Sequence, residues 1–126
     1  MRPITLLVCA GCAFGSGVPD PADLPEVVTW DDHVGYLMQD VCASCHGRTH
    51  RIEGYDFTTY DAVVCHWGDI REQLAGNQHP PGGAPRFDGW ELAIVHKWAS
   101  DGFAASMDAS GAPLFPAAPG CAGRGD

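Results

Sequence analysis

The chain has 126 residues, which is enough for one domain and excludes a multi-domain protein. Its 16 Asp and Glu outnumber its 7 Lys and Arg, and a net charge of −9 repels phosphate backbones and anionic lipid, so we expect no nucleic-acid partner. The 16 Gly and 10 Pro reduce the number of residues that can pack into a core. A core that small usually needs a further stabilising link, such as a disulfide, a metal or a cofactor, which we call a staple. Six Cys in such a chain must act as staples, ligands or attachment points.

The first 11 residues have the order of an export signal, because Arg2 precedes an apolar run that ends in small residues. The residues around Cys12 resemble a bacterial lipoprotein cleavage site, where Cys12 would be lipidated; a frayed apolar N-terminus is the alternative. No other run approaches the ~20 apolar residues of a membrane span, so any membrane attachment would be through acyl chains. Residues 12–28 predict a flexible spacer, and residues 105–126 an irregular tail.

Between these ends, apolar residues recur at helical spacing in three stretches, over about residues 30–45, 59–75 and 89–101. A capping pattern precedes each stretch, and a glycine that can end a helix follows the last. These residues are Thr29 with Asp32, Thr58 with Asp61, Asp88 with Glu91, and Gly102. No stretch alternates convincingly between apolar and polar residues, so the sequence predicts an all-α fold, a small helical domain over residues 29–104.

The first predicted helix ends in Cys42-Ala-Ser-Cys45-His46, the C-x-x-C-H signature of covalent c-type haem attachment. Cys42 and Cys45 lie one helical turn apart, so both sulfurs can form thioethers to the vinyl groups along one edge of a porphyrin. His46 follows directly and can direct its imidazole at the iron. One covalent haem would also supply the apolar staple that the small core needs.

Two other uses of a C-x-x-C pair compete with haem attachment. A thioredoxin-like redox site needs a βαβ setting, which this sequence does not predict. A zinc site needs a second pair of ligands at finger spacing. Haem attachment is therefore the favoured interpretation of Cys42, Cys45 and His46.

With this motif on its first helix, the stretch from about Thr29 to Phe103 resembles a mono-haem class I c-type cytochrome. It is more narrowly similar to planctomycete-type cytochrome c domains and related lipoproteins. The matching segments are Cys42 to Gly47 (CASCHG), Gly54 to Tyr60 (GYDFTTY), Pro80 to Gly83 (PPGG), and Glu91 to Trp98 (ELAIVHKW) with Asp101 and Gly102. The resemblance implies first and last helices packed together, a haem crevice between the helices and the loop before the last helix, and a role in electron transfer.

One departure concerns the sixth iron ligand. Where the family has Met-Pro-Pro in that loop, this chain has His79-Pro80-Pro81, so we expect His79 to take the position opposite His46. Met107, another histidine such as His66, and an open or water-bound site remain alternatives. Arg48 and Arg51, just past the motif, are either partners of the haem propionates or solvated loop residues.

The leading functional hypothesis is an electron carrier, rather than an enzyme, that exchanges electrons with a redox protein donor and acceptor. A haem enzyme or gas sensor with an open sixth position and a haem-free module held by disulfides or a metal are the alternatives. Thioether formation in bacteria takes place outside the cytoplasm, so the expected location is the periplasm, with a lipid anchor at Cys12. After the leader, the anchor and the haem are accounted for, Cys65 and Cys121 remain, and we expect a disulfide between them.

Overall fold

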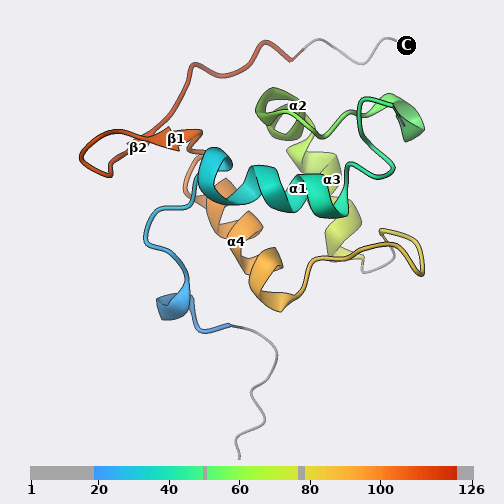
Figure 1. The fold of residues 1–126 in the computed structure, drawn as a ribbon, viewed down its shortest axis with the longest axis horizontal. Helices are drawn as coiled ribbons and strands as arrows, with labels where there is room; N and C mark the ends of the chain where they lie inside the picture. The colour runs from blue at the N-terminus through green and yellow to red at the C-terminus, as the bar shows by residue number, and fades with distance from the viewer. Residues whose placement is uncertain (1–18, 50, 77–78, 122–126) are drawn as a thin grey trace, which may run out of the picture.

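A computed structural model of the chain describes residues 19–49, 51–76 and 79–121, and these are mostly helical. The elements that Figure 1 labels are α1 (Gly35–Val41), α2 (Tyr60–Cys65), α3 (Trp67–Ala75), α4 (Gly89–Ser100), β1 (Ser106–Met107) and β2 (Pro113–Leu114). Short helical turns at Pro21–Asp23, Trp30–Val34 and Ile52–Gly54 complete the described structure. In the described ranges, no helix is both long and apolar enough to cross a membrane.

The first predicted helix is present, with a wider turn at its start. A π-helical turn, Trp30–Val34, leads into α1, and hydrogen-bonded turns continue to Cys45. Thr29 caps the element as expected, because its hydroxyl accepts a hydrogen bond from the Asp32 N–H. The π-helical turn packs against α4 and β1. This contact anchors the start of the helical element that leads to the cysteine motif.

The prediction of the second helix is wrong in two details. Thr59, and not Thr58, caps it through the Ala62 N–H, and the chain breaks at His66 into α2 and α3. At the break His66 leaves helical geometry, with φ −107° and ψ 14°. The turn lets His66 pack against Tyr55 on one side while the next residue, Trp67, packs edge-on against the aromatic core.

The last predicted helix is confirmed at both ends. Asp88 and Glu91 form a reciprocal capping box at the start of α4. At its end, Gly102 adopts φ 97°, its N–H donates to Ala99, and the Phe103 N–H donates to the Trp98 carbonyl, which together make a Schellman motif. The Phe103 ring then packs on Trp98, with centroids 5.0 Å apart. The chain is thereby turned back over the core.

The core is built around Trp98, which is fully buried and donates its indole N–H to the Ala104 carbonyl at 2.8 Å. Trp30, Tyr60, Trp67 and Phe103 surround its ring at centroid distances of 5.0–6.4 Å. The core also reaches into the segment expected to be a spacer, because Val28 is 1% exposed and Leu24 packs against the same cluster.

The expectation of an irregular, strand-free tail is wrong for its first half. β1 and β2 form an antiparallel hairpin, so the fold is mostly helical with one small sheet. The hairpin depends on its turn: hydrogen bonds from the Ser110 hydroxyl, and from the Ala112 and Ser110 backbone N–H groups, lower the pKa of the Asp108 carboxyl, and Gly111 takes φ 84°. Strands of two residues are too short to alternate, so periodicity could not reveal them.

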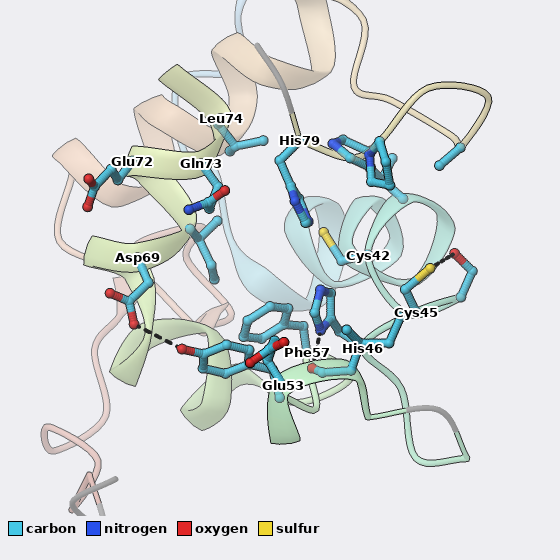
Figure 2. A pocket seen from close by; sticks show the side chains of 18 residues that line it. Cys42, Cys45, His46, Glu53, Phe57, Asp69, Glu72, Gln73, Leu74 and His79 are labelled. Atoms are coloured by element: carbon cyan, nitrogen blue, oxygen red, sulfur yellow. Dashed lines mark hydrogen bonds between the residues drawn. The ribbon is translucent and has the colours of Figure 1, made fainter. Parts of the chain in front are cut away.

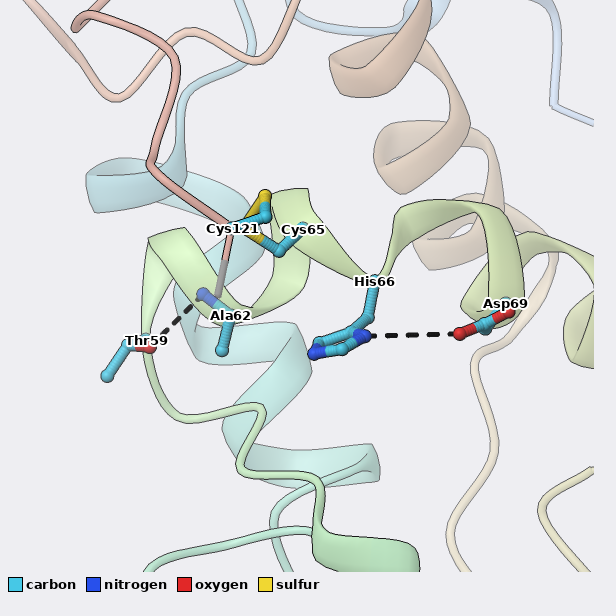
Figure 3. Close-up of a disulfide and its surroundings, with 6 residues drawn as sticks. All are labelled: Thr59, Ala62, Cys65, His66, Asp69 and Cys121. Carbon is cyan, nitrogen blue, oxygen red and sulfur yellow. Dashed lines mark hydrogen bonds and ion pairs between the residues drawn. A yellow bond between two sulfur atoms is a disulfide. The ribbon is translucent and has the colours of Figure 1, made fainter. Parts of the chain in front are cut away.

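The predicted disulfide is confirmed. Cys65, at the end of α2, is bonded to Cys121, which lies 56 positions later in the sequence, and their Cα atoms are 5.4 Å apart (Figure 3). The bond ties the C-terminal tail to the helical domain, just before the break at His66. The expected export signal and the lipidation site at Cys12 lie outside the described residues.

Candidate functional site

A cavity of about 640 Å³ opens between the end of α1, the loop that follows it, α3 and the loop before α4 (Figure 2). This volume lies within the range of small-molecule and cofactor sites, about 300–1,000 Å³. The motif residues Cys42, Cys45 and His46 all line it, and so does His79 from the opposite loop. Its apolar lining includes Val41, Ile52, Phe57, Ile70, Leu74, Pro80, Pro81 and Ala84.

His46 is held in one orientation by the loop that follows it. The residue is 8% exposed, and its Nδ1 lies 2.9 Å from the carbonyl oxygen of Ile52. Because a carbonyl can only accept, Nδ1 is the donor in this hydrogen bond, and in the neutral ring Nε2 then keeps its lone pair. Phe57 and Tyr55 pack against the ring, at centroid distances of 5.1 and 5.8 Å. This tautomer is the one in which Nε2 can bind a metal.

His79 faces His46 from the other side of the site, as Figure 2 shows. The two ring centroids are 5.9 Å apart and the planes differ by 33°. Two metal–nitrogen bonds of about 2 Å each, added to the half-widths of two imidazole rings, would separate the centroids by about 6 Å. The spacing therefore fits two imidazoles that share one ion between them.

Cys42 and Cys45 are both unpaired and partly buried. The Cys42 sulfur lies 3.7 Å from the sulfur of Met38, and burial raises the pKa of the Cys42 thiol to about 11. A redox-active C-x-x-C site needs the opposite, a thiol whose pKa is lowered so that the thiolate forms at neutral pH. The surroundings of Cys42 thus disfavour a thioredoxin-like site.

The charged residues at the cavity are acidic. Glu53, Asp69 and Glu72 line it, whereas none of its described lining residues is Lys or Arg. Arg51 pairs with Asp56 at 3.5 Å, outside the lining. Neither Arg48 nor Arg51 is among the residues that line the cavity.

The other sulfur and imidazole side chains considered as ligands are not among the residues that line the cavity. Met107 is on β1 and Met38 is buried in the core. His66 packs edge-on against Tyr55 and pairs with Asp69 at 3.9 Å, and it is not among the lining residues. Within the described residues, no three His, Cys, Asp or Glu side chains gather where they could hold an ion by themselves.

Two features of the site were missed by the sequence analysis. The first is the carbonyl of Ile52, since a backbone acceptor has no signature in the sequence. The second is Gly47, where an added Cβ would overlap the carbonyl oxygen of Ala43. The glycine that follows the motif in the sequence was the available signal, because a Gly beside a site marks a close backbone approach.

No protein-family model, no curated protein and no solved structure matches this chain.

Proposed function

We propose that this chain is a mono-haem c-type cytochrome that carries electrons. The observation that carries the proposal is the meeting of four residues at one apolar cavity: Cys42, Cys45 and His46 from the motif, and His79 from a loop more than 30 positions away. Cys42 and Cys45 would hold the haem through thioethers, and His46 and His79 would be its axial ligands. Bound there, the haem would supply a one-electron iron couple.

The two histidines support a carrier more than a catalyst. Both imidazoles line the same cavity, so the iron of a haem held by both of them would keep no coordination position open for a substrate or gas. His46 is fixed by Ile52 and by the ring of Phe57, and this rigidity keeps the reorganisation between oxidation states small. A pair of histidine ligands also favours a lower reduction potential than a His/Met pair.

Hydrogen bonds and two prolines restrain the loop that bears His79. The Arg86 guanidinium donates to the Pro80 carbonyl, and the Ala84 N–H donates to the Pro81 carbonyl at 3.2 Å. Pro80 and Pro81 fix φ at two successive positions, which lowers the entropy that the loop loses when His79 binds a metal. The loop therefore favours His79 over Met107 as the distal ligand.

The proposal includes a place for the protein. A disulfide beside two free cysteines in one chain is consistent with export to an oxidising compartment, provided that Cys42 and Cys45 are consumed by another reaction. Haem attachment is that reaction. We propose a periplasmic protein, anchored by a lipid at Cys12, with a redox protein as donor and another as acceptor.

The test is expression in an exporting bacterial host that carries haem-maturation machinery. The purified protein should show a Soret band and retain one haem mass through acid-acetone extraction, and the Cys42→Ala/Cys45→Ala double variant should lose it. A control that replaces the other cysteine pair, Cys65→Ala/Cys121→Ala, should keep the haem. A wild-type protein without a Soret band, or with freely extractable haem, would refute the proposal.

The distal ligand is tested separately. The wild-type protein should have a low-spin spectrum. The His79→Ala variant should lose that spectrum and bind carbon monoxide when it is reduced, and His79→Met should raise the reduction potential. His66→Ala is the matched control and should leave the spectrum low-spin. A low-spin spectrum that survives in His79→Ala would exclude His79.

A further inference from the structure

The loop after the motif contains a strained residue at the point where it supports His46. Glu53 has φ 57° and ψ 19°, in the left-handed region that residues with a side chain rarely adopt. Gly54 follows with φ 76°, a conformation that costs glycine little. Such an outlier persists only where the surrounding structure enforces it, and it then points to a functional constraint.

The constraint is visible in the hydrogen bonds of Ile52, the residue before Glu53. Its N–H donates to the Cys45 carbonyl at 3.1 Å, and its carbonyl accepts from His46 Nδ1 at 2.9 Å. The same carbonyl also accepts the Tyr55 N–H at 3.3 Å. One peptide segment thus grips both the backbone and the imidazole at the end of the motif.

The conformation of Glu53 decides where that carbonyl points. The peptide plane between Ile52 and Glu53 carries the carbonyl, and φ of Glu53 is the rotation about the bond at the far end of this plane. Downstream, the chain is fixed because the Phe57 N–H donates to the His46 carbonyl at 2.7 Å. If φ of Glu53 became negative, the plane would have to rotate and the carbonyl would leave His46.

We infer that Glu53 is a positioning residue for the proximal ligand: its left-handed backbone holds the Ile52 carbonyl on His46 Nδ1 and so sets the tautomer, orientation and basicity of the imidazole. This inference rests on the proposed function for its effect on iron. A histidine that donates its second N–H to a carbonyl is a more basic metal ligand. A more basic ligand favours the oxidised iron, so the turn at Glu53 lowers the reduction potential.

The experiment uses four uncharged replacements of Glu53, so that the loss of the carboxylate is common to all of them. Glu53→Gln, Glu53→Asn and Glu53→Gly can keep the left-handed conformation, whereas the β-branched side chain of Glu53→Val opposes it. The readouts are the midpoint potential of the isolated full-length protein and the ¹⁵N NMR signal of His46 Nδ1 with its proton exchange rate.

We expect the Gln, Asn and Gly variants to share one midpoint potential and a slowly exchanging Nδ1 proton. Glu53→Val should have a higher potential than these three and faster exchange. Equal potentials and equal exchange across all four variants would overturn the inference. If Glu53→Val does not fold, Gly54→Ala decides instead, because its added Cβ meets no atom within 4 Å and opposes only the φ of 76°.

The two readouts separate this inference from the proposed function. The NMR measurement needs no haem, so a protein isolated without a Soret band refutes the cytochrome proposal while the His46 exchange rates still test the role of Glu53. Conversely, if the protein carries haem but the His46 signal is the same in all four variants and in Gly54→Ala, the inference alone is refuted.

Discussion

The disulfide between Cys65 and Cys121 should stabilise the fold by less than its loop length suggests. A cross-link that closes a loop of 56 positions lowers the entropy of the unfolded chain, and this raises its free energy by about 4 kcal/mol at 25 °C. The folded state, however, also changes when the bond is removed. Leu114 accepts the last backbone hydrogen bond of the described tail, and the residues from there to Cys121 are mostly exposed. Without the disulfide, this tail would gain freedom.

The size of this freedom in the folded state can be worked out from the same loop entropy. Leu114 and Cys121 are seven positions apart, so in the folded state the bond closes a loop eight times shorter than in the unfolded state. Each doubling of loop length costs about 0.6 kcal/mol, and three doublings give a net stabilisation of about 2 kcal/mol. The disulfide should thus contribute about half of its simple loop value.

The assay is urea unfolding of the wild type and of Cys65→Ala/Cys121→Ala, followed by circular dichroism. A chain that carries Cys65→Ala and ends at Leu114 is the matched control, and it should be as stable as the double variant because the tail acts through the bond alone. A loss near 4 kcal/mol would show that the tail stays ordered by itself. A loss below about 1 kcal/mol would refute the loop-entropy reasoning.

Three other perturbations test the site and the core. Gly47→Ala should lower the unfolding free energy by about 1–3 kcal/mol and reduce haem incorporation, because its Cβ overlaps Ala43; normal incorporation at wild-type stability would contradict the close approach. Trp98→Phe should cost about 1–3 kcal/mol in chemical denaturation, since the Ala104 carbonyl keeps the Trp30 backbone N–H as a donor at 2.9 Å; a loss above 4 kcal/mol would argue against this. In haem-free protein at pH 8, iodoacetamide should label Cys42 about a hundredfold more slowly in the folded protein than in the protein unfolded in urea. Burial raises the pKa of the Cys42 thiol to about 11, so the reactive thiolate forms only as the pH approaches that value. Equal labelling rates in the two states would contradict this burial.

The parts of the fold that the sequence predicts are those with local causes. The capping box of Asp88 and Glu91 and the glycine at Gly102 each act within a few residues, and both ends of α4 are found where expected. The break at His66 has no such local cause. It arises because His66 and Trp67 pack against different parts of the molecule, and a periodicity analysis assumes one face for the whole helix.

The candidate site divides in the same way. Cys42, Cys45 and His46 could be singled out because the proposed haem attachment needs a fixed spacing along one turn. His79 was expected as a ligand because it stands beside Pro80 and Pro81, in the place where the proposed family has a methionine. The support of His46 by Ile52 depends on the backbone conformation of Glu53, and nothing in the side chain of a glutamate predicts a left-handed residue.

The cavity also connects the proposed function to stability. Ile70 and Leu74 on α3 present apolar surface to it from one side, and Val41 at the end of α1 does so from another. An open apolar cavity of this size deprives its walls of packing contacts. In the proposed cytochrome, Cys42 and Cys45 would hold the haem through thioethers in the unfolded chain as well, and the residues lining the cavity would cover it once the chain folds. Its contribution to folding is then an intramolecular burial, which does not depend on haem concentration as the binding of a free ligand would. In the proposed cytochrome, Cys42 and Cys45 would thus hold the redox group and also add its apolar surface to the core around Trp98.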